Sequence, residues 1–289
     1  IYIPSFICRD MLAPINALNI SYVLYEVDEM LNPILEEIEC DVILFINYFG
    51  FSQRIEPFVK YKKKYGSIIL EDNAHGFLSK DVNGKLLGCR GDIGLLSIRK
   101  TIFLPNGAAL IVNNEKYSKI DFKSAEVSSS VEDKKYFNKL WLKKIIFTKY
   151  LGISILSTKG FIRFLKTGNR IPLQDPMSEK ELPSNKYLTP LLARKELFLD
   201  ATSESGRRVH MFKEIQKIAK KYGIVPICDL YDGVVPYEFA FIDKGNSRKF
   251  ENSLLLKGFY LLPWPDLPDE VVGNCPDFYK NIRVVPFLW

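Results

Sequence analysis

Short apolar runs alternate with polar, helix-like stretches along the first half of the chain. Met11–Leu18 and the basic Gln53–Tyr65 have the apolar spacing of amphipathic helices. The apolar runs are rich in Ile, Val and Leu, which is typical of strands buried on both faces of a sheet. This alternation predicts an α/β fold, with a mostly parallel sheet flanked by helices. The expected strands are Tyr22–Val27, Asp41–Asn47, Ser67–Asp72, Asp92–Ser97 and Ala108–Asn113.

The second half of the chain has a different pattern. Residues 133–166 are rich in Lys and aromatic residues, and we expect a solvated helix packed on the sheet or at a dimer contact, with a membrane-surface helix as the alternative. A polar linker, 168–182, follows. Beyond it we expect a smaller α+β domain, so that the large domain spans 1–167 and the linker and C-terminal domain span 168–289. Its expected helices are Leu188–Leu199, Ser205–Tyr222 and Arg248–Lys257, and its expected strands are Ile224–Cys228 and Tyr237–Ile242.

Composition narrows the class of protein. The chain has 289 residues, of which 47% are hydrophobic and 26% charged, as in a soluble globular protein of roughly two domains. A net charge of +6 favours an anionic small molecule and is too weak to indicate nucleic acid. The five cysteines form no C-x-x-C pair, so reduced thiols in a cytoplasm are expected. The two histidines cannot supply a multi-histidine metal site, and Lys and Arg interrupt every apolar run, so no transmembrane helix is expected.

Asp72 and Lys100 are the first candidates for chemistry. Each follows an expected strand, and ligands of open α/β sheets bind beyond the carboxyl ends of strands. A lysine can form a Schiff base with an aldehyde, and a nearby carboxylate can keep a pyridine nitrogen protonated. The pair therefore suits pyridoxal 5'-phosphate (PLP) chemistry. The alternative is that neither residue is catalytic, with a solvent-facing lysine and a helix-capping aspartate.

Several ordered motifs around this pair resemble those of the DegT/DnrJ/EryC1/StrS family of sugar aminotransferases. The family has an E-D-x-A-Q/H turn, a G-D-I/V-G strand start, a serine before the lysine loop, and a G-G-A strand after the lysine. In this chain these motifs correspond, in the same order, to Glu71–His75, Gly91–Gly94, Ser97, and Lys100 followed by Gly107–Ala109. Upstream, Ile3–Phe6 resembles the family's V-P-S/A-Y/F strand end, and Asn47–Gly50 resembles its H/N-x-Y/F-G loop.

The resemblance implies a type I PLP-dependent transferase fold and a role for each matching residue. Lys100 would bind the cofactor covalently and carry protons during transamination, and Asp72 would pair with the pyridine nitrogen. His75 would lie near the phenolic oxygen, Ser97 would donate to the phosphate, and Cys8 would take the position of a ring-stacking aromatic. The implied substrates are a nucleotide-linked keto sugar and glutamate as amino donor. The implied enzyme is a homodimer with its active site at the interface, in polysaccharide or secondary-metabolite biosynthesis.

The chain also departs from the family pattern. Two residues separate Ser97 from Lys100, where most members have four, which places the chain in a divergent S-x-R-K-T branch. The family's glycine-rich phosphate turn would precede Ile1, so we expect the N-terminal part of the large domain to be missing. This gap and Cys8 favour the alternative of a non-catalytic homologue that binds or scaffolds.

Three further interpretations stay open. A PLP-dependent sugar dehydratase is disfavoured, because relatives with that activity typically have histidine in place of Lys100. A nucleotide-sugar oxidoreductase is disfavoured because no G-x-G-x-x-G turn is present. Arg207 and Arg208 are either surface residues or ligands of a substrate diphosphate, and Trp264 either lines the substrate mouth or packs in the core.

Overall fold

The structure is a computed structural model of the chain. It describes residues 1–102, 104, 106–120, 126–127, 188–193 and 197–287, together with isolated positions between 154 and 182. The basic stretch 133–166 and the linker 168–182 lie almost entirely outside the described residues. The expected boundary between 167 and 168 also falls there, and the two-domain division stays a prediction.

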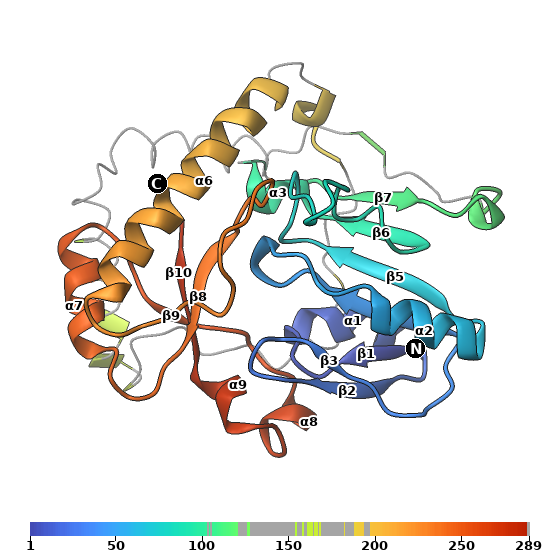
Figure 1. The fold of residues 1–289 in the computed structure, drawn as a ribbon, viewed down its shortest axis with the longest axis horizontal. Coiled ribbons are helices and arrows are strands. Elements are labelled where there is room, and N and C mark those ends of the chain that lie inside the picture. Colours follow the sequence, from blue (N-terminus) through green and yellow to red (C-terminus); the bar gives the residue numbers. More distant parts are fainter. Residues whose placement is uncertain are drawn as a thin grey trace.

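A seven-stranded sheet forms the first half of the chain (Figure 1), in the order β3-β2-β1-β4-β5-β6-β7. Its five central strands are parallel, and the edge strands β3 and β7 are antiparallel to their neighbours. The mostly parallel α/β sheet that the sequence predicts is therefore confirmed. The strands are β1 (Tyr2–Pro4), β2 (Val23–Val27), β3 (Pro33–Ile34), β4 (Val42–Ile46), β5 (Ile68–Asn73), β6 (Ile93–Leu96) and β7 (Ala109–Val112).

Two helices cover opposite faces of this sheet. The side chains of Leu44 and Phe45 alternate along β4, so they mark the two faces. The helix α2 (Glu56–Tyr65) packs on the Phe45 face, where Phe58 stacks on Phe45 with ring centroids 4.7 Å apart. The helix α1 (Leu12–Ala17) lies over the Leu44 face.

The second half of the chain forms a three-stranded antiparallel sheet beside the long helix α6 (Leu197–Lys220), which stands at the left of Figure 1. The strand order is β8-β10-β9. One continuous hydrophobic core joins this sheet and α6 to the large sheet, because buried side chains of both belong to a single cluster. The remaining elements here are β8 (Glu238–Ile242), β9 (Leu262–Pro263), β10 (Ile282–Pro286), α7 (Arg248–Leu256), α8 (Asp269–Val272) and α9 (Asp277–Asn281).

Short helical turns complete the described elements. Four of them follow strands of the large sheet, the fifth precedes α6, and one of them carries the candidate lysine. They are the helix α3 (Ile98–Thr101) and the 3-10 turns η1 (Arg9–Met11), η2 (Tyr48–Gly50), η3 (Glu115–Tyr117) and η5 (Pro190–Ala193).

The expectations for the second half need three corrections. Ile224–Cys228 is not a strand, although Ile227 N donates to Ala240 O beside β8. The expected break before Ser205 is wrong, because α6 runs unbroken from Leu197 to Lys220. The low helix propensity of its polar residues is too weak an effect to end the helix there. Leu188–Leu199 is not one helix: Leu188 forms an isolated bridge with Val127, and η5 follows. No helix within the described part of the chain is both long and apolar enough to cross a membrane.

Candidate active site

Three turns meet at the carboxyl edge of the large sheet. The parallel strands β4, β5 and β6 end side by side, and each runs directly into one of these turns. The turn after β4 contains Phe49, the turn after β5 contains His75, and β6 runs through Ser97 into α3 with Lys100. The fold therefore brings together residues that lie far apart in the sequence.

Lys100 and His75 are in direct contact. The Lys100 Nζ lies 3.1 Å from His75 Nε2. Burial lowers the pKa of His75 well below its usual range, and the nearby charges of Lys100 and Arg208 lower it further. His75 is therefore neutral at neutral pH, and Nε2 can accept a hydrogen bond from the lysine. Its other nitrogen, Nδ1, is buried and has no hydrogen-bond partner among the described residues.

Aromatic rings hold the His75 imidazole in one plane. Tyr237 stacks on it with centroids 4.5 Å apart and planes 5° apart. Phe49 lies on the ring at 6.2 Å and 15°, and Trp264 meets it edge-on at 5.7 Å. Trp264 also packs on the buried rings of Phe6 and Tyr48, so it joins the core beside the site, and whether it lines the substrate mouth stays a prediction. Because the imidazole ring cannot turn, Nδ1 keeps a fixed direction.

Asp72 is the next-to-last residue of β5 and lines a cavity on the Leu44 face of the sheet. Its side chain is buried, and Oδ1 accepts a hydrogen bond of 2.8 Å from Ala74 N. Burial raises the pKa of Asp72, whereas the Ala74 N–H and the charge of Lys100 oppose that rise. The cavity measures about 540 Å³, and Ala74 and Ser97 share its wall with apolar side chains. A cavity of this size, with few polar groups in an apolar wall, is typical of small-molecule sites.

The remaining candidates, Ser97 and Cys8, lie beside the same site. Ser97 directly precedes α3, and its carbonyl accepts a hydrogen bond of 3.3 Å from Lys100 N. Burial raises the pKa of the Cys8 thiol to about 11, while the charge of Lys100 lowers it and that of Asp72 raises it. Cys8 is therefore within electrostatic range of both Lys100 and Asp72. The structure gathers all five candidates, and their individual roles stay predictions.

One charged residue of this region, Glu238, was not singled out from the sequence. Glu238 begins β8 with one carboxylate oxygen, Oε2, buried and without a hydrogen-bond partner in the described structure. Burial raises the pKa of Glu238 to about 7, against the charges of Lys100 and Arg208. The sequence signal that could have identified it is a glutamate directly before an apolar run, Phe239–Ile242. Arg208, for which the sequence left two interpretations open, is buried on α6 and contacts the Lys100 turn, so the interpretation as a surface residue is wrong.

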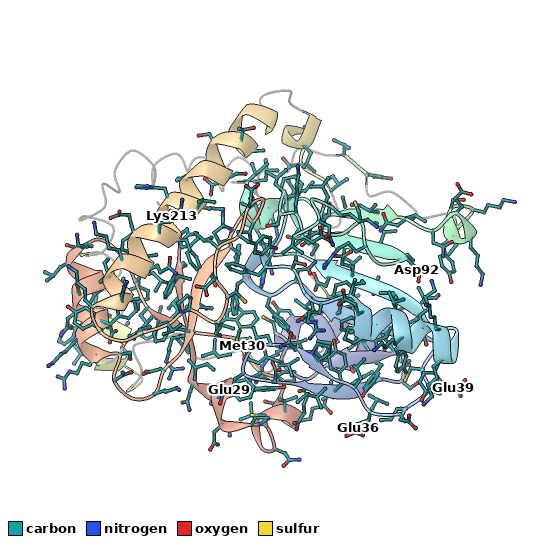
Figure 2. All side chains as sticks on the ribbon, viewed as in Figure 1. Glu29, Met30, Glu36, Glu39, Asp92 and Lys213 are labelled. Carbon is teal, nitrogen blue, oxygen red and sulfur yellow. The ribbon has the colours of Figure 1, made fainter. Side chains whose placement is uncertain are left out.

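The G-D-I-G motif is explained by packing at the start of β6. A Cβ on Gly94 would lie 1.9 Å from Gly88 O, and one on Gly91 would lie 2.9 Å from Ile69 O. The Asp92 carboxylate accepts from Ile69 N at 2.8 Å and pairs with Lys62 of α2 at 2.5 Å. Figure 2 shows Asp92 at the side of the molecule remote from α6. This motif therefore builds the sheet and contributes no reactive group.

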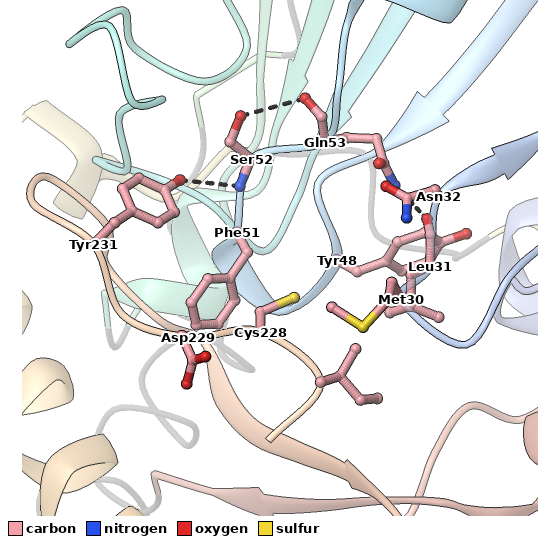
Figure 3. A pocket seen from close by; sticks show the side chains of 11 residues that line it. Met30, Leu31, Asn32, Tyr48, Phe51, Ser52, Gln53, Cys228, Asp229 and Tyr231 are labelled. Carbon is pink, nitrogen blue, oxygen red and sulfur yellow. Dashed lines mark hydrogen bonds between the residues drawn. The ribbon is translucent and has the colours of Figure 1, made fainter. Parts of the chain in front are cut away.

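A second cavity, of about 270 Å³, lies between the large sheet and the loop before β8 (Figure 3). Its polar wall groups are largely occupied by the protein. Tyr231 Oη accepts from Ser52 N at 3.1 Å, and Gln53 Nε2 donates to Leu31 O at 2.5 Å. Cys228 and Asp229 complete the polar wall. We therefore place the candidate active site at Lys100 and not here.

The residues at the carboxyl edge fit PLP. A Schiff base requires an accessible amine, which Lys100 offers while it is half-buried. The pyridine nitrogen requires a carboxylate in a dry environment, which Asp72 offers. The buried, unpaired Nδ1 of His75 offers a hydrogen bond that no described protein group uses.

Comparisons with known proteins agree with this geometry. Residues 17–153 match the DegT/DnrJ/EryC1/StrS aminotransferase family. No curated protein matches the sequence of the chain.

Solved structures match the chain over 99% of its length. The aminotransferase TlmJ from Streptoalloteichus hindustanus is 13% identical with a TM-score of 0.58, over 72% of that chain. An aminotransferase of the same family from Brucella abortus is 12% identical with a TM-score of 0.57, over 73% of that chain. The GDP-4-keto-6-deoxy-D-mannose-3-dehydratase of E. coli, with bound hydrated PLP, is 16% identical with a TM-score of 0.54, over 75% of that chain. At these identities the likeness establishes the fold. The chain is thus similar to the DegT/DnrJ/EryC1/StrS aminotransferase family over residues 17–153, and as a whole it has the fold of these aminotransferases.

Proposed function

We propose that this chain is a PLP-dependent aminotransferase that acts on a nucleotide-linked keto sugar, with glutamate as amino donor. The observation that carries the proposal is the position of Lys100 Nζ, 3.1 Å from His75 Nε2 and within electrostatic range of the buried Asp72. PLP chemistry requires an amine for the Schiff base and a partner for the pyridine nitrogen, and the neutral imidazole of His75 offers a further hydrogen bond beside them.

Each of these residues has a distinct task in the proposal. Bound PLP supplies an electron sink that stabilises negative charge at the substrate carbon. Lys100 holds the cofactor and afterwards moves a proton between two carbon atoms. Asp72 keeps the pyridine nitrogen charged, and His75 offers a fixed hydrogen bond from Nδ1. Ser97 donates to the phosphate, and Cys8 packs beside the ring.

The choice of substrate class is supported by relatives. One similar structure, DesI, was solved in the presence of its TDP-sugar product, and another is a GDP-sugar dehydratase. Both proteins bind a sugar attached to a nucleotide diphosphate. The net charge of +6 favours such an anionic substrate. We further infer a cytoplasmic homodimer, with the active site at its interface, in polysaccharide or secondary-metabolite biosynthesis.

Cofactor capture tests the proposal. Purified protein mixed with PLP is expected to develop a yellow absorption band, and borohydride is expected to fix the label on a peptide that contains Lys100. Lys100→Ala is expected to lose the label entirely, whereas Lys116→Ala, an exposed lysine on η3, serves as the matched control. If no band forms, or if Lys100→Ala keeps the label, the proposal fails.

A second candidate is a non-catalytic homologue that binds or scaffolds. The specific observation in its favour is Cys8, which offers less packing surface to a ring than an aromatic side chain does. Glutamate distinguishes the two functions, because an aminotransferase converts the bound cofactor to its pyridoxamine form and bleaches the yellow band. A chain that captures PLP but never bleaches with any amino donor would support the second candidate.

A further inference from the structure

Arg208 reaches from α6 into the turn that carries Lys100. Its side chain is 5% exposed. The Nη2 donates to the carbonyl oxygens of Lys100 and Thr101 at 3.1 and 3.4 Å. The Nη1 donates to Tyr237 O at 2.9 Å, and Nε donates to Glu204 at 2.9 Å.

These two carbonyls need an outside donor. Helix α3 is only four residues long, Ile98–Thr101, and the last carbonyls of any helix lack intrahelical partners. Ile102 N closes the turn onto Ile98 O, which leaves the later carbonyls to other groups. A cation near the carboxyl end of a helix also interacts favourably with its partial negative charge. Arg208 therefore supplies hydrogen-bond donors to the carbonyls at the carboxyl end of this short helix.

The same guanidinium fixes the opposite wall of the site. It holds the Tyr237 carbonyl and lies over the Tyr237 ring at 5.4 Å. That ring stacks on His75, whose Nε2 contacts Lys100 Nζ. Arg208 thus binds the backbone carbonyl of Lys100 directly, and it contacts the Tyr237 ring that stacks on His75.

We propose that Arg208 is a positioning residue, which holds the α3 turn and the Tyr237 ring so that Lys100 Nζ stays against His75. The four contacts occupy four of the five N–H groups of a guanidinium, so it is not placed to bind a substrate diphosphate. The consequence for cofactor capture rests on the proposed function, whereas the consequence for the α3 turn does not.

Hydrogen–deuterium exchange of the cofactor-free chain tests the first consequence. Arg208→Lys keeps the charge but removes the planar fork. We expect backbone exchange in the α3 turn to accelerate about tenfold, because the turn loses hydrogen bonds from a charged donor; this fold-change corresponds to about 1.4 kcal/mol. Arg207→Lys is the matched control, since Arg207 pairs with the same Glu204 but donates to Phe287 O at 3.1 Å. An unchanged α3 turn in Arg208→Lys, or equal acceleration in both variants, overturns the proposal.

The rate at which borohydride-fixed PLP accumulates on Lys100 tests the second consequence. We expect Arg208→Lys to slow capture about tenfold, as the lost charged hydrogen bond implies, and Arg207→Lys to match the parent. Faster exchange without slower capture overturns the positioning role. If the parent itself captures no PLP, the proposed function fails, and the exchange result still decides whether Arg208 holds the turn. Should Arg208→Lys fail to fold, Glu204→Gln replaces it, because it removes the anchor and leaves the guanidinium.

Discussion

Glu71 and Asp72 are neighbours on β5, yet their carboxylates point to opposite faces of the sheet. On the α2 face, Glu71 is fully buried and accepts hydrogen bonds from Arg90 Nε and Asn47 Nδ2, each at 2.9 Å. It also accepts from the backbone N–H of Arg90 and Gly91. On the other face, the one hydrogen bond to the Asp72 carboxylate is that of Ala74 N, within the described residues.

The pKa shifts follow this difference in pairing. Burial raises the pKa of both residues, but Arg90 and the donors around Glu71 reverse the effect and hold its pKa below the ordinary value. The pKa of Asp72 stays raised, because the Ala74 N–H and Lys100 only partly oppose its burial. A saturated carboxylate holds a fold together, whereas an under-paired one retains capacity for a ligand. The motif E-D therefore joins a structural residue to a functional one.

Among substitutions that compare the two faces of the sheet, we expect the largest effect from Asp72→Asn. An amide cannot keep a pyridine nitrogen protonated as a carboxylate does, so the rate of transamination should fall on the order of a thousandfold, or about 4 kcal/mol of transition-state stabilisation. Single-turnover kinetics with glutamate measures this loss. The midpoint of urea unfolding should change little, and a variant that is merely unfolded would contradict the assignment.

The reverse pattern is expected from Glu71→Gln. Removing one partner of a buried ion pair leaves the Arg90 charge uncompensated, at a cost of about 3 kcal/mol of unfolding free energy. In the parent, the depressed pKa of Glu71 means that this stabilisation is present above the ordinary value of 4.5 and is lost as the pH falls toward the folded-state pKa. Urea titrations at pH 7 and at low pH measure both effects. If Glu71→Gln is as stable as the parent at pH 7, the structural role assigned to Glu71 is wrong.

Glu238→Gln is expected to change stability with the opposite sign. Its pKa of about 7 exceeds the ordinary 4.5, so the folded state binds the proton more tightly than the unfolded chain. Stability therefore falls as the pH rises from 4.5 to about 7, and the cost is complete above that range. The glutamine variant should be more stable than the parent at pH 8 and nearly equal to it at low pH; the difference is at most about 3.5 kcal/mol, since one pKa unit corresponds to about 1.4 kcal/mol. Thermal melts across this range check it, and a variant destabilised at pH 8 would show that Glu238 has a partner.

Five of the seven strands of the large sheet could be predicted from the sequence, because short runs of Ile, Val and Leu are typical of strands in a parallel sheet. The five expected strands of the first half agree with β2, β4, β5, β6 and β7 to within two residues. The carboxyl-edge location of Asp72 and Lys100 followed from the strand order of an α/β fold. Family motifs then added His75, Ser97 and Cys8, which the structure places beside them.

The rest of the site depended on contacts that no local pattern encodes. Arg208 and Lys100 are separated by 108 positions, and their hydrogen bond runs to a backbone carbonyl, which leaves no mark on composition. The unbroken α6 likewise depends on tertiary packing, because buried Ala201, Phe212 and Ile215 hold it through its polar stretch. Long-range pairing of this kind can be seen only in the folded chain.

The loop before β8 is joined to the large sheet by its backbone. Tyr237 N donates to Phe49 O at 2.7 Å, and Ser79 exchanges two hydrogen bonds with the backbone of Val235. Gly50 lies so close to this loop that a Cβ would stand 2.5 Å from Val235 O. Because these contacts and one continuous core join the two sheets, we expect them to unfold together. We also expect access to Lys100 to depend on side-chain and loop rearrangement more than on a hinge between the sheets.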